Sequence, residues 1–399
     1  MNARTDDDLA VRLRRTLADD LARGGDLRSP EWRRAVETVP REVFLGERIY
    51  RRVDTETWTR WEPLVAADLG AERWLGLAYT DESWVTQLDG RDGQAESDGP
   101  VVSEVRGTPT SSSTMPGLVV RMLEDLRVED GHRVLEIGTG TGYSTALMCE
   151  RLGAGLVTSV EVDPGVAARA RDALHRAGYH PALIVGDGLA GHPAGAPYDR
   201  AVATCAVRRI PDAWLEQVRP GGLVLATLSG WLYGSALARL TVTGPGKAEG
   251  EFLPGTVSFM PARPHAAPPP GELPPREGER RDAVFGAEVL DEWTSLWIAQ
   301  LAMPTATSVT VCYPDDEPPA CCLVDHATGS WAWLHEVSEG RTTVRQSGPV
   351  RLWDRIEAAL GAWHEAGAPE QQAFRLRVSG GEQVVFLPDA PVLRWRLPG

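Results

Sequence analysis

A glycine-rich turn at residues 138–142 constrains the fold more than any other feature of this sequence. It follows the apolar run 134–137, which contains Glu136, and it precedes a helical segment at 144–152. Glycines at alternate positions let a ligand lie against bare backbone, and the next helix offers free N–H groups. A dinucleotide fingerprint would need a third glycine where this chain has Tyr143. The turn predicts an α/β fold with a ligand at this point, although glycines needed only for packing would give the same pattern.

The segments after the turn strengthen the prediction of a nucleoside site. The apolar run 156–160 ends at Glu161, and the run 182–185 leads into Asp187. An acid at the end of the second strand can accept hydrogen bonds from both ribose hydroxyls of a nucleoside. The second carboxylate is expected near the adenine amino group. Further strands are predicted at 200–203 and 223–227, which completes a parallel α/β sheet. The alternative is a Rossmann-like sheet that binds nothing.

Composition restricts the possible partners and the compartment. The net charge of −15 disfavours nonspecific binding to nucleic acid or to anionic membranes. No apolar segment follows Met1, so we expect neither a signal peptide nor a membrane span. Five cysteines without a C-x-x-C pair indicate a reduced, cytoplasmic protein. The eight histidines have no paired metal spacing, and no metal site is predicted.

The pattern along the chain predicts four segments. Residues 1–108 form N-terminal helices with an insert, and residues 109–263 form the nucleoside-binding domain. Prolines concentrate at 264–282, which predicts a linker. Short strands and one helix at 350–366 then predict a C-terminal α+β accessory domain at 283–399. The predicted fold class is α/β, a Rossmann-like sheet with an N-terminal helical and insert region and this C-terminal domain.

Several ordered motifs carry a resemblance to a known family. The E-x-G-x-G-x-G pattern at 136–142 resembles motif I of class I methyltransferases that depend on S-adenosylmethionine. Other segments resemble the protein-L-isoaspartate (D-aspartate) O-methyltransferases: Val39–Phe44, Ser113–Pro116, Gly186–Gly188, Ala196–Arg200, Ile210–Pro211, Gln217, Pro220–Gly222 and Phe259–Pro261. The resemblance covers about residues 30–263. It departs from the family at Thr114, which replaces the catalytic serine, and at 51–108, which is longer than in the repair enzymes. Residues 283–399 have no counterpart in the repair enzymes.

The resemblance implies a set of site residues and S-adenosylmethionine as the cofactor. Those expected at the cofactor are Glu136, Gly138, Thr139, Gly140, Gly142, Tyr143, Glu161, Asp187 and Gly188. The hydroxyls of Thr114, Ser113 and Ser112 are expected to hold the acceptor carboxylate, although they also suit an N-cap for the helix that begins near Pro116. A carboxylate is already ionised at neutral pH, so methyl transfer to it needs no strong general base.

The extended layout resembles a subgroup of methyltransferases found beside ATP-grasp ligases (graspetides) or lanthipeptide synthetases in ribosomal peptide biosynthesis. That resemblance implies methylation of an Asp side chain in a precursor peptide, which such an enzyme has cyclised, and closure of the methyl ester to an aspartimide. General repair of isoaspartyl protein is the alternative, and a noncatalytic cofactor-binding subunit is the second alternative. The accessory domain is expected to recognise the peptide, whose identity the sequence leaves open.

Overall fold

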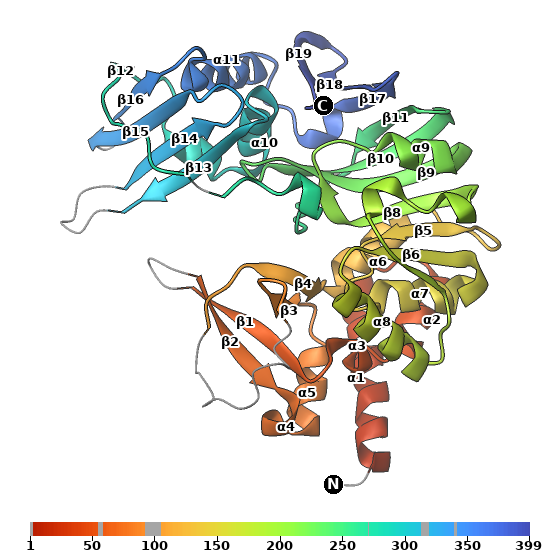
Figure 1. Ribbon diagram of the computed structural model, residues 1–399. Coiled ribbons are helices and arrows are strands. Elements are labelled where there is room, and N and C mark those ends of the chain that lie inside the picture. The colour runs from red at the N-terminus through yellow and green to blue at the C-terminus, as the bar shows by residue number, and fades with distance from the viewer. Residues whose placement is uncertain (1–2, 55–58, 92–104, 270, 313–318, 339–340) are drawn as a thin grey trace. The chain divides into compact units, whose positions relative to one another are not determined.

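The computed structural model describes residues 3–54, 59–91, 105–269, 271–312, 319–338 and 341–399 (Figure 1). Contacts between residues divide the chain into two compact units. The first comprises Met1–Thr204 and Glu216–Leu225, and the second comprises Cys205–Leu215 and Ala226–Gly399. No helix in the described ranges is both long enough and apolar enough to cross a membrane.

The first unit begins with three helices, α1 (Ala3–Gly24), α2 (Pro30–Thr38) and α3 (Glu42–Leu45). Leucines repeat at every fourth position of α1, and Leu17 and Leu21 are buried. Helix α2 begins where sequence rules predict, because the Ser29 hydroxyl accepts a hydrogen bond from the Trp32 N–H at 3.4 Å and proline occupies the first turn.

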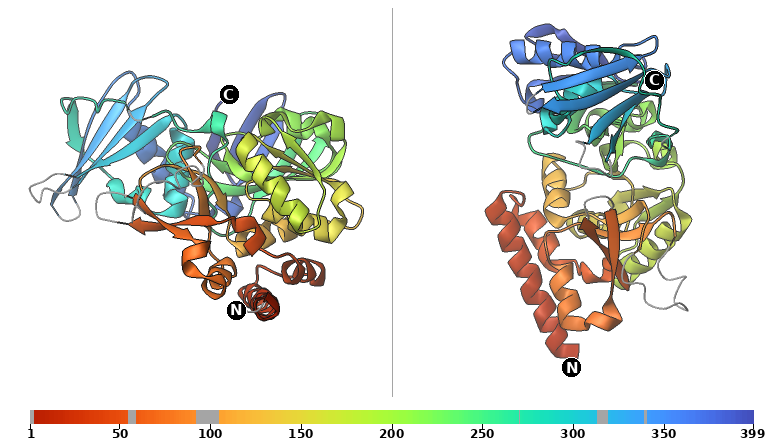
Figure 2. Two further views of the ribbon diagram at one scale, coloured as in Figure 1. Left: turned by 60° about the horizontal axis from the view of Figure 1, so that its bottom comes forward. Right: turned by 90° about the vertical axis from the view of Figure 1, so that its left-hand side faces the viewer.

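Four antiparallel strands form an inserted sheet, in the order β2-β1-β3-β4. Their bounds, with those of two short helices between them, are β1 Arg48–Asp54, β2 Thr59–Val65, α4 Ala66–Leu69, α5 Ala71–Ala78, β3 Trp84–Leu88 and β4 Pro109–Ser113. A small core of Tyr50, Trp61, Val85 and Leu88 stabilises the sheet. Figure 2 shows the red helix α1 beside the orange helices of this insert, in line with the contact between α1 and α5. The sheet places the serine run of β4 at an edge.

The nucleoside-binding sheet of the first unit has the strand order β9-β8-β5-β6-β7. Strand β5 pairs in parallel with both β6 and β8, and β6 pairs in parallel with β7. The strands are β5 Val134–Ile137, β6 Val157–Glu161, β7 Ala182–Val185, β8 Tyr198–Val207 and β9 Val218–Ser229. The helices are α6 Pro116–Asp125, α7 Tyr143–Leu152, η1 Ala154–Leu156, α8 Pro164–Arg176, η2 Gly188–Ala190 and η3 Pro193–Gly195. These parallel strands and the helices between them confirm the predicted α/β fold. Acids and glycines follow the carboxyl ends of adjacent strands.

The second unit contains two groups of antiparallel strands (Figure 1). One has the order β10-β11-β17-β18-β19, with β10 Ser235–Gly244, β11 Lys247–Phe252, β17 Arg375–Ser379, β18 Glu382–Leu387 and β19 Ala390–Arg396. The other has the order β12-β16-β15-β14-β13, with β12 Glu279–Asp282, β13 Ala306–Val311, β14 Ala320–Asp325, β15 Trp331–Ser338 and β16 Arg341–Ser347. The helices are α9 Asp212–Gln217, η4 Arg263–His265, η5 Ala287–Leu290, α10 Trp293–Ala302, α11 Leu352–Glu365 and η6 Gln371–Ala373.

The strand pairing differs from the predicted C-terminal division at one point. Strand β17 pairs with β11, so the last three strands continue a sheet that begins before the proline-rich segment. That segment also contacts its own unit, because the Trp333 indole N–H donates to the Pro274 carbonyl at 3.3 Å. The four-part division stays a prediction; the sheet β12-β16-β15-β14-β13 and its helices span residues 279–365, and its strand β12 lies inside the predicted linker.

Candidate functional site

The glycine turn between β5 and α7 is built on left-handed backbone. Gly138, Gly140 and Gly142 have φ values of 93°, 55° and 91°, which side chains rarely allow. Gly142 is also the N-cap residue of α7, which begins at Tyr143, one residue before the predicted start at 144. The Thr204 hydroxyl on β8 donates to the carbonyl of Ile137 at 3.1 Å and also to that of Gly138. The neighbouring strand β8 therefore holds the turn in place, and the glycines leave its backbone uncovered by side chains.

Glu161 joins the end of β6 to this turn. Its Oε2 accepts a hydrogen bond from the Gly140 N–H at 2.9 Å, and its Oε1 accepts one from the Asp163 N–H at 3.0 Å. The side chain is 8% exposed. A carboxylate can accept about four hydrogen bonds, so both oxygens keep acceptor capacity for a ligand. Beside it, the buried hydroxyls of Thr139 and Ser159 are 2.6 Å apart and link the turn to β6.

Glu136 lies beneath the turn, fully buried. Its carboxylate accepts hydrogen bonds from three hydroxyls, those of Ser144, Thr145 (2.5 Å) and Ser159 (2.7 Å). Burial raises its pKa, against the effect of these donors. The geometry shows what Glu136 does for the protein: it ties β5, β6 and α7 together. A direct contact with the cofactor stays a prediction.

Asp187 and Gly188 follow β7, as predicted. The Asp187 side chain is exposed, and its Oδ1 accepts a hydrogen bond from the Leu189 N–H at 2.9 Å. Its other oxygen has no hydrogen-bond partner among the described residues. A Cβ on Gly188 would lie 2.5 Å from the Ile137 Cγ2, so only glycine lets this segment approach the end of β5. Both predicted residues therefore lie at the same edge of the sheet as the glycine turn.

The hydroxyl-bearing run at the end of β4 reaches the glycine turn through Ser112. A Cβ on Gly140 would lie 3.4 Å from the Ser112 carbonyl oxygen, so the two segments are in close contact. Ser113 is 1% exposed, and its hydroxyl has no partner in the described part of the chain. Thr114 is half-buried in the short connection to α6. Its predicted alternative role as a helix cap is not observed, because α6 has Met115 as N-cap residue and no side-chain cap bond.

Arg41 positions the hydroxyl-bearing run, although it was not among the predicted site residues. Its buried guanidinium donates to the carbonyls of Ala78 (2.9 Å), Thr80 (2.8 Å) and Glu82 (2.7 Å). It also donates to the carbonyls of the acceptor run, at Ser113 (3.5 Å) and Thr114 (3.3 Å). Burial lowers the pKa of Arg41 to about 10, so the side chain stays charged at neutral pH. The Val-Pro-Arg motif was the sequence signal for this residue.

Tyr143, the first residue of α7, directly follows the glycine turn and is buried. Its ring is 3% exposed, 6.0 Å from the Phe44 ring, and the Arg41 guanidinium lies 5.7 Å from its centre. Burial raises its pKa to about 12. These contacts give Tyr143 a packing role between α3 and α7, and its predicted contact with the cofactor stays a prediction.

A cleft of about 440 Å³ opens beside the turn. Gly140, Thr141 and Ser111 line part of it, and the rest is lined by residues of α3, β1, β3 and α8 and by the link between α3 and β1. Its charged lining residues are of both signs: Glu42, Glu47, Arg48, Arg169, Asp172 and Arg176. The cleft leads to the point where the turn meets the serine run. No cluster of three or more potential metal ligands occurs in the described ranges.

Comparison with known proteins agrees with this geometry. A model of the family described as protein-L-isoaspartate(D-aspartate) O-methyltransferase matches residues 101–242. The protein-L-isoaspartate O-methyltransferase of Hyperthermus butylicus is 32% identical over 246 residues, which cover 59% of this chain and 83% of that protein. The chain belongs to the protein-L-isoaspartate O-methyltransferase family. The predicted family is thereby confirmed, and with it the assignment to methyltransferases that use S-adenosylmethionine.

Other relatives are matched over smaller shares. The Ignicoccus hospitalis enzyme of the same name is 37% identical over 148 residues, which cover 37% of this chain and 69% of that protein. One from Anaeromyxobacter dehalogenans is 49% identical over 113 residues, which cover 27% of this chain and 52% of that protein. A solved structure named protein-L-isoaspartate O-methyltransferase aligns with a TM-score of 0.49 and 21% identity, over 92% of this chain and 96% of that one.

Proposed function

We propose that the protein transfers a methyl group from S-adenosylmethionine to the free carboxylate of L-isoaspartyl residues in peptides and proteins. The observation that carries the proposal is the position of Gly140. Its N–H is bonded to Glu161, and its α-carbon lies against the Ser112 carbonyl. One residue of the turn thus contacts both the acid expected at the ribose and the run expected at the acceptor. Membership of the family supports the same reaction.

The residues of the turn suit the cofactor of this family. Glu161 keeps acceptor capacity for two ribose hydroxyls, and the exposed Asp187 carboxylate suits the adenine amino group. The N-terminus of α7, with Gly142 as cap, offers free N–H groups and a positive dipole end to a carboxylate. When bound, S-adenosylmethionine supplies an electrophilic methyl group on a sulfonium centre.

The protein's own contribution is alignment. The acceptor carboxylate is ionised at neutral pH, so its oxygen attacks without a general base. The unpartnered Ser113 hydroxyl and the Thr114 hydroxyl are the groups proposed to hold the carboxylate in line with the methyl carbon. Arg41 fixes the backbone of both residues through their carbonyls. The resulting methyl ester has a better leaving group than the free acid, so the next backbone amide closes a succinimide without further catalysis.

Tailoring of a ribosomal peptide is the second candidate. It is favoured by one observation, the large second unit that lies mostly outside the 101–242 family match. The sheet of β12–β16 and its two helices provide surface that a repair enzyme for unrelated flexible substrates does not need. The named relatives support isoaspartyl repair better, and repair is therefore the main proposal.

The choice of acceptor separates these candidates. The full-length protein is offered pairs of linear peptides that differ only in one residue, L-isoaspartyl or L-aspartyl, in several unrelated sequences. Repair predicts that every isoaspartyl peptide gains one methyl group by mass spectrometry and later loses methanol, while the aspartyl partners stay unmodified. Methylation confined to an aspartyl residue of one cyclised peptide would contradict repair and establish tailoring.

A further inference from the structure

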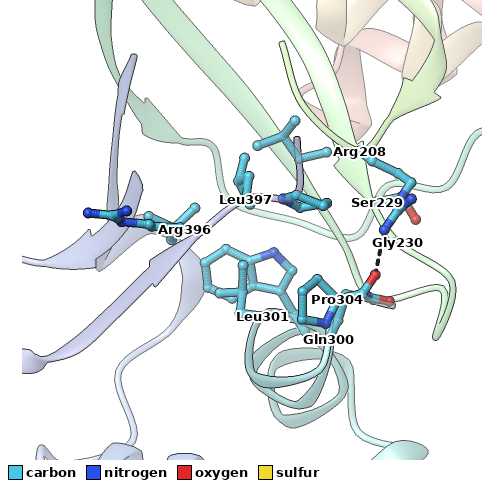
Figure 3. Close-up of a pocket in the computed structure, with 13 residues that line it drawn as sticks. Arg208, Ser229, Gly230, Gln300, Leu301, Pro304, Arg396 and Leu397 are labelled. Atoms are coloured by element: carbon cyan, nitrogen blue, oxygen red, sulfur yellow. Dashed lines mark hydrogen bonds between the residues drawn. The ribbon is translucent and has the colours of Figure 1, made fainter. Parts of the chain in front are cut away.

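A hollow in the second unit lies between helix α10 and the end of strand β19 (Figure 3). Arg208, Gln300 and Leu397 are among its lining residues. Its volume of about 20 Å³ admits one group of the size of a water molecule, which is too small for a second substrate or an effector. The contacts that bear on methyl transfer lie instead in the first unit, around the start of helix α6.

Helix α6 begins directly after residues 112–114, the acceptor run, and it has no cap of its own. Its first residue, Pro116, has no backbone N–H to donate, and the N-cap residue, Met115, makes no side-chain cap bond. The start of a helix leaves several N–H groups without partners inside the helix, and a nearby polar side chain usually satisfies them. The partners of this helix start come from a distant part of the chain.

The loop at residues 80–83, which precedes strand β3, supplies these partners. The Asp81 Oδ1 accepts a hydrogen bond from the Gly117 N–H at 2.6 Å. The Ser83 Oγ accepts a hydrogen bond from the Met115 N–H at 2.9 Å. Two side chains of one loop therefore cap α6 from more than 30 positions earlier in the sequence.

Strand pairing and Arg41 join the same two segments on the other side of Thr114. Trp84, the residue after the loop, lies opposite Ser113 in the antiparallel pairing of β3 with β4. Arg41 donates to two carbonyls of the loop, and it also donates to those of Ser113 (3.5 Å) and Thr114 (3.3 Å). The backbone is therefore held before, at and after Thr114, whose hydroxyl is proposed to orient the acceptor carboxylate.

Glycine at 117 allows the loop to approach the helix. A Cβ there would lie 2.6 Å from the Asp81 Oδ2 and 2.9 Å from the Asp26 Oδ2, closer than real Cβ contacts. Two carboxylates thus converge on the first turn of α6, where the positive end of the helix dipole favours negative charge. Burial raises the pKa of Asp26, Arg121 opposes this effect, and the charge of Asp81 adds to it. The contact depends on an acid at 81 and also on a glycine at 117.

We propose that Asp81 and Ser83 are positioning residues for methyl transfer, which fix the start of α6 and thereby hold the Thr114 hydroxyl in place. They act through the backbone N–H groups that they bind, and not through contact with the substrate. A displacement of about 1 Å at a reacting group can lower a rate about 100-fold, so the position of this backbone matters for turnover. The inference rests on the proposed function, in which Thr114 orients the acceptor.

Turnover of single variants tests the proposal, with active sites counted by binding of S-adenosylhomocysteine. Both side chains are largely exposed, so their replacement leaves the core intact. Asp81→Ala is expected to lower kcat about tenfold and to leave the affinity for S-adenosylhomocysteine unchanged. Asp81→Asn keeps an acceptor oxygen for the Gly117 N–H and is expected to retain about half of the wild-type kcat or more. A loss in Asp81→Asn as large as that in Asp81→Ala would overturn the proposal.

A second pair of variants and a matched control accompany these. Ser83→Ala is expected to lower kcat about threefold, and Ser83→Thr, which keeps the hydroxyl, is expected to restore it. This pair replaces the Asp81 pair if Asp81→Ala does not fold. Ser29→Ala removes the cap bond of α2, a helix outside the acceptor run, and is expected to leave kcat unchanged.

A double-mutant cycle separates positioning of Thr114 from general support of the fold. Residues that act as a unit have non-additive effects on turnover. Once Thr114→Val has removed the hydroxyl, Asp81→Ala is therefore expected to lower kcat by less than about threefold more. Independent losses, which would multiply to about 100-fold in the double variant, would overturn the proposal.

The choice of acceptor keeps this test distinct from that of the proposed function. The cycle uses whichever peptide, isoaspartyl or aspartyl, the wild type methylates, so failure of repair still leaves the positioning decided. Hydrogen exchange, followed by mass spectrometry on fragments that cover residues 112–118, needs no turnover at all. Exchange in these fragments is expected to be about tenfold faster in Asp81→Ala than in wild type or Ser29→Ala. Equal exchange in all three proteins would overturn the proposal.

Discussion

Replacement of Arg41 by methionine is expected to destabilise the first unit strongly. The guanidinium donates to three carbonyls at 2.9, 2.8 and 2.7 Å, those of Ala78, Thr80 and Glu82, from a fully buried position. Hydrogen bonds to a charged group contribute about 1.5–3 kcal/mol each, so the gross loss is about 4.5–9 kcal/mol. Removing the desolvated charge offsets part of this loss. We expect a net decrease of about 3–5 kcal/mol in the free energy of unfolding, the range for breaking a buried charged network.

Urea unfolding measures this decrease, with Arg23→Met as the matched control. Arg23 pairs with Asp20 on the exposed surface of α1, and its loss is expected to change stability by less than about 0.5 kcal/mol. Because Arg41 also holds the carbonyls of Ser113 and Thr114, methyl transfer should fall more than binding of S-adenosylhomocysteine. Equal unfolding midpoints for Arg41→Met and Arg23→Met would refute the reasoning.

Three further outcomes follow from the site. Glu161→Ala should weaken S-adenosylhomocysteine binding by about tenfold or more in calorimetry, since it removes the two charge-assisted hydrogen bonds proposed to ribose; unchanged affinity would remove Glu161 from the ribose site. Gly188→Ala should lower Tm, because the new Cβ would meet Ile137, whereas Gly186→Ala, with nothing within 4 Å, should not. Burial would raise the pKa of Asp199, but hydrogen bonds from a backbone N–H and an arginine side chain lower it overall, so Asp199→Asn should reduce stability at pH 7. That deficit should begin to shrink as pH falls below about 4, where the unfolded carboxyl gains its proton, and should vanish only below the lowered folded-state pKa, where the group is protonated in both states; a deficit independent of pH would contradict it.

The sequence predicted the nucleoside-binding part of the fold because each element there has a local signal. Apolar runs of four or five residues ended in Glu161 and Asp187, and positive φ values at the glycines of 138–142 required that residue type. Register did not need to be known, since parallel strands bring their carboxyl ends to one edge. Strand topology did not predict that Ser112 lies near the turn; only the resemblance to the family did.

What could not be predicted depends on contacts between distant segments. The inserted sheet lacks a sustained alternation of polar and apolar residues, so its β1–β2 hairpin gave no periodic signal. Pairing of β17 with β11 joins residues more than 120 positions apart, which no local pattern reports. The sequence also offered no sign that three hydroxyls would surround Glu136 in the interior; its expected contact with the cofactor stays a prediction. A residue of a motif can therefore be required because it supports a turn.

Methyl transfer to one isoaspartyl peptide by wild type and by Thr114→Val tests the central claim most directly. Valine keeps the shape of the side chain and removes only the hydroxyl proposed to orient the carboxylate. The account predicts a base-labile methyl ester on the peptide with wild type, and turnover reduced about tenfold or more in the variant with S-adenosylhomocysteine binding unchanged. Wild-type protein that binds S-adenosylhomocysteine but transfers no methyl group to the isoaspartyl carboxylate would contradict it.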